Sequence, residues 1–289
     1  MDRFGDAQFV VFSNRVIALL LTLVAITIKR GRQPTHVAPY YKHAYTSCSN
    51  IMSTWCQYEA LKYVSFPAQT ICKASKVVAT MLMGRIVRGQ KHSKREYACG
   101  FGIGIGATLF LLASGRDSGS EHGSVAGTMS GLILMLGYLA FDAFTPQWQK
   151  SLFDGYRPKM SRPQMMLGTN TFSALLCLVS LLEQGSLTES MNFALTHSHF
   201  GWDVFALSFS GACGQFFIYA TIDRFGPIVF AAIMTIRQML SIIVSSLTYD
   251  HPMSPVALIG FVVVFGSIFL DTHRRYTENR KAPDQVRLV

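Results

Sequence analysis

The sequence predicts an all-α protein that crosses a membrane many times. Of its 289 residues, 50% are hydrophobic and only 15% are charged, whereas soluble domains carry about 25% charged residues. The apolar residues form long runs along the whole chain, and the charges cluster between these runs. Runs of about 20 residues match a bilayer core, in which only helices and closed barrels satisfy their own backbone groups. Because the sequence lacks the alternation of barrel strands, we expect helices.

Nine membrane spans are expected, joined by connections too short to hold a separate soluble domain. They cover residues 8–29, 44–62, 66–87, 97–115, 125–146, 163–183, 202–222, 227–248 and 255–271. The second span is the weakest, because Ser, Thr and Cys are frequent in it. We therefore expect residues 1–289 to form a single membrane domain. The six cysteines form no CxxC pair, so neither disulfides nor a metal site is expected.

The basic residues lie mostly on one side of the predicted spans. Of the 26 Lys and Arg residues, most fall in the connections 29–42, 85–95 and 150–162 and in the tail 272–289. Only Arg3, Lys62 and Arg116 lie on the other side. This bias places the basic side and the C-terminus in the cytosol, and nine spans then place the N-terminus on the opposite side. The net charge of +10 follows from this topology, and no nucleic acid is expected as a partner.

An internal repeat relates the first four spans, in order, to the last four. At offsets of 156 to 161 residues, Asn14 aligns with Asn170 and Lys76 aligns with Arg237. Only the fifth span (125–146) has no counterpart in the repeat. We expect a first repeat of four spans (1–115), a second of five (125–271) and a basic cytosolic tail (272–289), with the first of ten spans missing from this chain. Repeats with an odd number of spans are inverted in the membrane, which is typical of transporters.

Four cations lie inside predicted spans, where a charge costs at least about 2.5–3.5 kcal/mol and normally faces a cavity or a partner. They are Arg15, Lys73, Lys76 and Arg237, with Lys73 and Lys76 on one helical face and Lys76 and Arg237 near the middle of their helices. Glu59 and Asp142 are the clear acids within the spans. We interpret the cations as lining a cavity for a polyanion. The alternative is that Glu59 pairs with one lysine and the remaining cations cap helices or line crevices.

Several polar side chains are further candidates for binding the substrate. Tyr58, Tyr219 and Gln57 lie on spans that flank the cations and are candidates to hold a ring or a ribose, although buried tyrosines more often serve packing. Asn170 joins them from the repeat alignment. The spans contain no combination of His, Asp and Ser residues that suggests catalysis, so we expect neither an enzyme nor a cofactor.

Four segments resemble the nucleotide-sugar transporter family of the drug/metabolite transporter superfamily. They are YEALKYVSFPAQTICKASKVVATMLMG (58–84), FDAFTPQWQKSLF (141–153), SLLEQG (180–185) and ACGQFFIYATIDRFGPIVFAAIMTIRQ (212–238). The resemblance implies ten spans in a Golgi membrane and exchange of a cytosolic nucleotide conjugate for a lumenal nucleotide by alternating access. It also implies that Lys73, Lys76, Arg237 and Gln238 line the substrate cavity.

Within this family the segments are most similar to members that carry adenosine 3′-phospho 5′-phosphosulfate. That molecule has about four negative charges against two for most nucleotide sugars, so a cavity with several cations suits it better. A UDP-sugar carrier and a non-transporting form that lacks the first span are the alternatives. The expected partners are thus the nucleotide substrate, a nucleotide counter-substrate and the lipid bilayer, with the oligomeric state open and a homodimer as one alternative.

Overall fold

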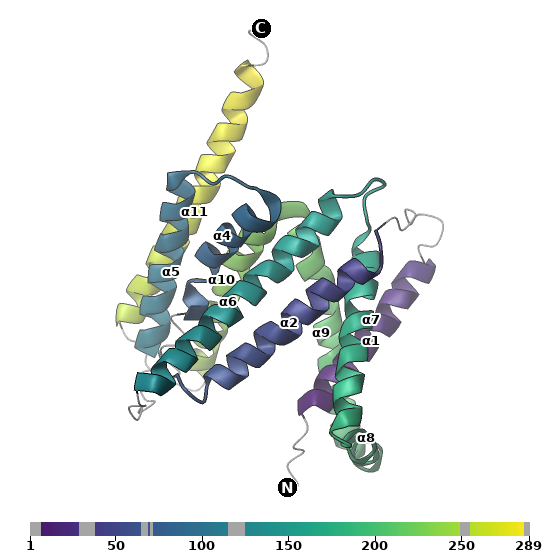
Figure 1. The fold of residues 1–289 in the computed structure, drawn as a ribbon. Helices are drawn as coiled ribbons and strands as arrows, with labels where there is room; N and C mark the ends of the chain where they lie inside the picture. Colours follow the sequence, from purple (N-terminus) through teal and green to yellow (C-terminus); the bar gives the residue numbers. More distant parts are fainter. Residues whose placement is uncertain are drawn as a thin grey trace. The chain divides into compact units, whose positions relative to one another are not determined.

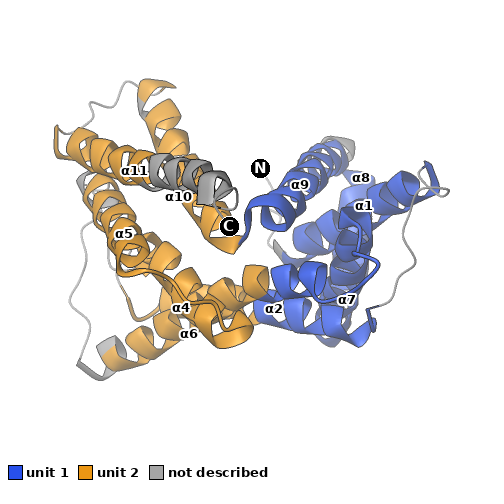
Figure 2. Cartoon of the chain, turned by 90° about the horizontal axis from the view of Figure 1, so that it is seen from above, with its two compact units in different colours: residues 1–51, 148–226 blue, residues 52–147, 227–289 orange. Residues whose placement is uncertain are grey.

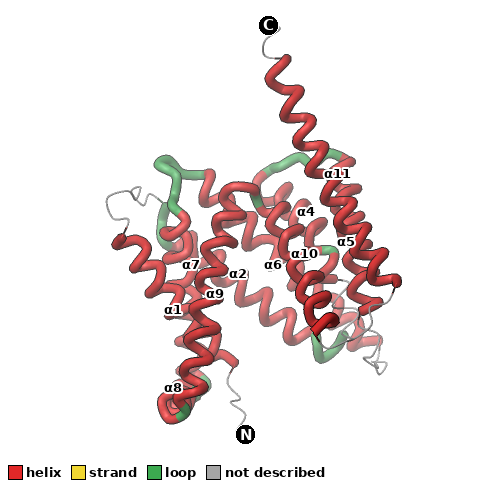
Figure 3. Tube along the Cα trace, turned by 180° about the vertical axis from the view of Figure 1, so that it is seen from behind, coloured by secondary structure: helices red, strands yellow, loops and turns green. Residues whose placement is uncertain are grey.

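The computed structural model describes residues 7–28, 38–64, 69, 72–114, 125–248 and 255–285, and this part of the chain contains helices and no strand (Figure 3). The all-α prediction is therefore confirmed. The helices, shown in Figure 1, are α1 (Ala7–Ile28), α2 (Tyr41–Ala60), α4 (Lys76–Arg88), α5 (Lys94–Ser114), α6 (Val125–Asp154), α7 (Arg162–Glu183), α8 (Leu187–Thr196), α9 (Ser198–Phe225), α10 (Pro227–Thr248) and α11 (Pro255–Gln285).

Five helices in the described ranges are long and apolar enough to cross a membrane. These stretches are Gln8–Ile28, Met129–Asp154, Arg162–Glu183, Phe200–Phe225 and Pro227–Ser245, and Pro255–Leu270 is a shorter apolar helix. The chain is therefore a multi-pass membrane protein. The count of nine spans and the inversion of the repeats stay predictions, because α2, α4 and α5 do not meet the same criteria.

The structure departs most from the predicted spans at three places. The span 66–87 is interrupted by a turn at Ser75, whose backbone N–H and hydroxyl both donate to the carbonyl oxygen of Cys72, at 3.2 and 2.8 Å. Helix α6 does not end at residue 146 but continues past Pro146, and Gln147 is fully buried. Helix α11 extends well beyond residue 271, into the segment predicted as the tail.

The chain divides into two compact units, which Figure 2 distinguishes by colour. Unit 1 comprises residues 1–51 and 148–226, and in it α1 packs against α7 and α9. Its core contains small and flexible side chains, among them Ala18, Met165 and Ala212, which let the helices approach closely.

Unit 2 comprises residues 52–147 and 227–289. Its closest helix pair is α5 and α11, and α4 packs on α5 and α10. The α5–α11 crossing depends on glycine: a Cβ on Gly106 would lie 2.8 Å from the carbonyl oxygen of Gly260, and one on Gly102 would lie 2.5 Å from the Ser267 hydroxyl oxygen. The sequence predicts this role for Gly102 and Gly106, because the glycine run lies inside a span, where small residues allow close helix packing.

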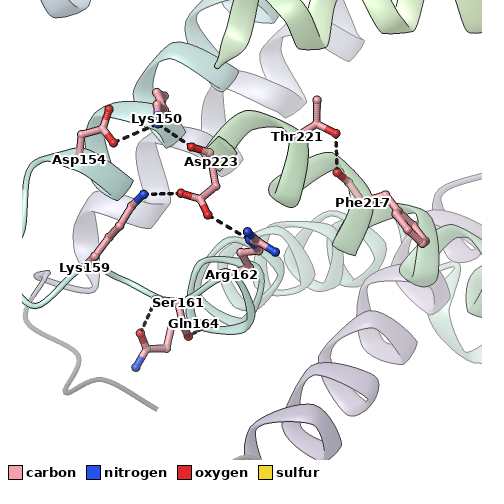
Figure 4. Close-up of polar contacts among 9 residues, drawn as sticks. All are labelled: Lys150, Asp154, Lys159, Ser161, Arg162, Gln164, Phe217, Thr221 and Asp223. Atoms are coloured by element: carbon pink, nitrogen blue, oxygen red, sulfur yellow. Dashed lines mark hydrogen bonds and ion pairs between the residues drawn. The ribbon is translucent and has the colours of Figure 1, made fainter. Parts of the chain in front are cut away.

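A cluster of charges joins three helices at the basic end of unit 1 (Figure 4). The carboxylate of Asp223, near the end of α9, pairs with Lys159 at 2.7 Å and with Arg162 at the start of α7 at 3.0 Å. The ammonium group of Lys150 on α6 donates to the backbone oxygen of Asp223 at 2.6 Å and pairs with Asp154 at 3.0 Å. These contacts fix the ends of α6, α7 and α9 to one another.

We expect Asp223→Asn to lower the thermal stability of the full chain. The variant loses two charge-assisted contacts whose basic partners are half exposed, so the loss should be about 1–2 kcal/mol. The measurement is the thermal midpoint of the detergent-solubilised protein. Asp203→Asn is the matched control, since Asp203 is an exposed aspartate on the same helix. Equal midpoints for the two variants would contradict a structural role for the cluster.

Candidate functional site

Two of the predicted cations lie close together in unit 2. Lys76 is the first residue of α4, and its ammonium nitrogen lies 2.6 Å from a carboxylate oxygen of Asp142 on α6. The same nitrogen lies 5.9 Å from the ring centre of Phe230 on α10, close enough for a cation–π contact. Lys73, which is half buried, interacts electrostatically with both Asp142 and Lys76. The carboxylate of Asp142 thus interacts with the ammonium groups of both Lys73 and Lys76. This cluster therefore carries an excess of positive charge.

The start of α4 adds to this positive character. Lys76 does not lie near the middle of a continuous helix, and it does not share one with Lys73, because the turn at Ser75 separates them. The N-cap residue, Ser75, makes no side-chain hydrogen bond to the first turn of α4. The backbone N–H groups of a helix start carry partial positive charge and favour anions. The break therefore combines a helix N-terminus with two lysines, an arrangement suited to a phosphate or sulfate group.

Arg237 and Gln238 lie near the middle of α10, also in unit 2. Thr235 and Met239 on the same helix are buried, whereas Arg237 is exposed and Gln238 is intermediate. Arg237 follows Phe230 by seven residues, so both lie on one helical stripe, roughly 10 Å apart along the axis. Helix α10 packs on α4. The stripe of α10 that contacts Lys76 through the Phe230 ring therefore also carries a second cation, Arg237.

Glu59 does not neutralise the cations of this cluster. Its carboxylate pairs with Lys62 at 2.8 Å, three residues further along the chain, just beyond the end of α2. The interpretation in which Glu59 pairs with Lys73 or Lys76 is therefore wrong, since the acid that contacts Lys76 is Asp142. The side chain of Tyr58 is 65% exposed, and the backbone oxygen of Gln57 accepts a hydrogen bond from Gln69 at 3.1 Å.

The other predicted residues form a polar group in unit 1. The guanidinium group of Arg15 on α1 donates to the side-chain oxygen of Asn170 on α7 at 3.3 Å. The amide of Asn170 donates to Gln215 on α9 at 2.8 Å and to the backbone oxygen of Met166 at 2.9 Å. Asn170 is fully buried and Tyr219 is 5% exposed. A hydrogen-bonded chain thus links α1, α7 and α9, the three helices that pack in this unit.

Three functional candidates were missed from the sequence. Asp142 was recognised as an acid within a span, but not as the partner of Lys76. Phe230 was not distinguishable from other apolar residues of its span. Gln215 had a signal, because it precedes Tyr219 by four residues and so lies on the same face of a helix.

These features define a class of protein. Helices that are apolar enough to cross a membrane carry arginines, a carboxylate and amides within their length, and such residues in a bilayer mark the pathway of a polar or charged solute. The excess of cations in unit 2 suits an anion. A membrane carrier for a small anionic solute is the class that this combination indicates.

The chain belongs to the UAA transporter family, whose model matches residues 2–275. It is 57% identical over 284 residues to adenosine 3′-phospho 5′-phosphosulfate transporter 1 of Caenorhabditis elegans, a match that covers 98% of this chain and 66% of that protein. The human protein of the same name is 47% identical over 274 residues, covering 95% of this chain and 62% of the relative. UDP-galactose/UDP-glucose transporter 5 of Arabidopsis thaliana is 38% identical over 94% of this chain and 78% of its own length. The chain thus spans less than two thirds of the length of these two adenosine 3′-phospho 5′-phosphosulfate transporters.

The resemblance to nucleotide-sugar transporters is confirmed by these matches, and the relatives are named as transporters rather than as enzymes.

Proposed function

We propose that this protein carries adenosine 3′-phospho 5′-phosphosulfate from the cytosol into the Golgi lumen, in exchange for a nucleotide, by alternating access. The observation that carries the proposal is the group formed by Lys73, Lys76 and the uncapped start of α4, which faces the single carboxylate of Asp142. Such a group favours a ligand with several negative charges. The names and high identity of the first two relatives support the same substrate.

Arg237 and Gln238 extend this group along α10. An arginine contacts phosphate through two parallel hydrogen bonds, whereas lysine acts as a point charge, so the two residue types can bind different groups of one ligand. In unit 1, Arg15, Asn170 and Gln215 offer further donors and acceptors, and we propose that they also contact the substrate. No residue in this scheme performs catalysis, because transport needs binding and release alone.

We expect proteoliposomes that contain the protein to take up the radiolabelled sulfated nucleotide. Adenosine 3′,5′-bisphosphate should compete strongly, because it retains the adenosine and two phosphate groups, and UDP-galactose should compete at least about tenfold less well, since fewer charges meet the cations. Protein-free liposomes give the background.

UDP-sugars are the second candidate substrates, favoured by the relatives from Arabidopsis thaliana. Equal competition by UDP-galactose and the bisphosphate would show that the substrate assignment is wrong. Membership of the transporter family would stand under either outcome.

A further inference from the structure

An apolar groove of about 570 Å³ runs between α4, α5 and α6 in unit 2. Of its lining residues, only Ser75 and Thr108 carry a polar side chain, and none is charged. Five large apolar side chains along it are more than half exposed: Leu82, Ile86, Phe101, Ile105 and Leu136. The groove is therefore unsuited to a nucleotide. Its chemistry matches a hydrocarbon chain.

The dimensions of the groove match one leaflet of a membrane. Along α4 and its N-cap residue, the lining extends from Ser75 to Ile86, which corresponds to roughly 16 Å at 1.5 Å per helical residue. Half of a hydrocarbon core of about 30 Å is nearly the same length. One lipid acyl chain of one leaflet can thus lie along the whole groove.

One end of the groove is strongly basic. Arg85 lies at the edge of the groove, three residues after Leu82 and next to Ile86 on α4. Lys94 lies on the same stripe of α5 as the lining residues Phe101 and Ile105. Both basic side chains are exposed. The turn between the helices adds Lys91, and Arg95 follows it at the start of α5; both are also exposed.

The acid at this turn is already engaged. The carboxylate of Glu96 accepts a hydrogen bond from the backbone N–H of Ser93 at 2.9 Å and lies 3.4 Å from His92. Even with this carboxylate counted, residues 85–96 carry five basic side chains against one acid, so the positive charge beside the groove remains in excess. The excess of Lys and Arg on one side of the predicted spans assigns this turn to the cytosolic surface, where acidic lipids attract basic segments.

We propose that this groove binds one acidic phospholipid of the cytosolic leaflet. One acyl chain lies between Leu82, Phe101 and Leu136, and the headgroup phosphate contacts Arg85 and Lys94. Apolar burial of the chain gives affinity, and the two cations select an anionic headgroup over a zwitterionic one. The site is separate from the Lys76 group in its chemistry, so the proposal does not depend on which nucleotide is carried.

The test uses native mass spectrometry of the full chain in detergent, titrated with phosphatidylinositol or with phosphatidylcholine of the same acyl chains. We expect the first phosphatidylinositol adduct to form with a Kd at least about tenfold lower than that of phosphatidylcholine. The double variant Arg85→Gln/Lys94→Gln should lose this preference. Arg224→Gln, which removes an exposed arginine from the last turn of α9, should keep it.

A second variant tests the groove itself. Ala140 is an exposed residue of its lining on α6, so Ala140→Phe should fill the groove and weaken the binding of both lipids. Equal Kd values for the two lipids with the unaltered protein would overturn the proposal, as would unchanged lipid binding by Ala140→Phe. If Ala140→Phe instead converts a dimer to a monomer and leaves lipid binding intact, the groove holds a second copy of the chain and the proposal is wrong.

Discussion

Lys76→Ala and Arg237→Ala are each expected to abolish nearly all nucleotide uptake while leaving the protein inserted in the membrane. A cation that contacts phosphate is worth about 1.5–3 kcal/mol as a charge-assisted hydrogen bond, so its loss weakens binding on the order of 10- to 100-fold. Arg237→Lys should retain part of the activity, because the charge remains while the bidentate contact is lost. The measurement is uptake into proteoliposomes at equal protein content, with Lys62→Ala, which removes an exposed lysine outside the cluster, as the control.

One more variant separates the loss of the Lys76–Asp142 ion pair from the loss of substrate binding. Lys76→Ala removes the 2.6 Å partner of the Asp142 carboxylate and leaves it only the electrostatic interaction with Lys73, and this alone destabilises the protein. The double variant Lys76→Ala/Asp142→Asn removes that penalty. If Lys76 binds substrate, the double variant should be as stable as the unaltered protein and still inactive. Restored uptake in the double variant would falsify a direct role for Lys76.

Gly260→Ala is expected to destabilise unit 2 strongly. A Cβ on Gly260 would lie 2.5 Å from the backbone nitrogen of Phe110 and 2.6 Å from the carbonyl oxygen of Gly106. Both neighbours are backbone atoms of α5, so no side-chain rotation relieves the clash and α5 and α11 must separate. Overpacking of this kind costs about 1–3 kcal/mol or more, against a gain of about 1 kcal/mol in helix propensity. The thermal midpoint of the purified protein should fall by several degrees.

Substitutions at two further glycines test how the loss of stability depends on the space around the added Cβ. A Cβ on Gly266, also on α11, would meet nothing within 4 Å, so Gly266→Ala should be neutral or slightly stabilising. Gly102→Ala should lie between the two, because its close neighbour is the Ser267 hydroxyl, which can rotate. The same midpoint for all three variants would contradict the close crossing.

The sequence predicted features that depend on composition and local pattern. The all-α class follows from apolar runs of membrane length, and close helix packing through Gly102 and Gly106 follows from a run of small residues within a span. That α11 is the partner is seen in the structure alone. The resemblance in four segments was enough to predict the family. These signals are read along the chain and need no knowledge of which helices touch.

Ion-pair partners could not be predicted in the same way. Sequence alone did not distinguish Glu59 from Asp142 as the acid that neutralises Lys76, because the choice depends on how α4 packs against α6. The turn at Ser75 was missed as well. Serine is common in membrane helices, and only the backbone, in which the Ser75 N–H bonds to the Cys72 carbonyl three residues back, shows that this helix is interrupted. The link from Arg15 through Asn170 to Gln215 joins three helices from distant parts of the chain.

Because Asp142 pairs with Lys76, a ligand binds at this site only when it interacts with Lys76 more favourably than this carboxylate does. In the empty carrier the carboxylate acts as a built-in counterion, and any incoming anion must displace it from the ammonium group. Chloride or a singly charged metabolite offers no more charge than Asp142 does and so gains little from the exchange. A ligand with several phosphate or sulfate groups gains new contacts with Lys73 and the start of α4 as well, which makes the exchange favourable. In the proposed transporter, the Asp142 carboxylate thus competes with incoming anions, excludes the abundant small anions of the cytosol and leaves the site to scarce polyanions.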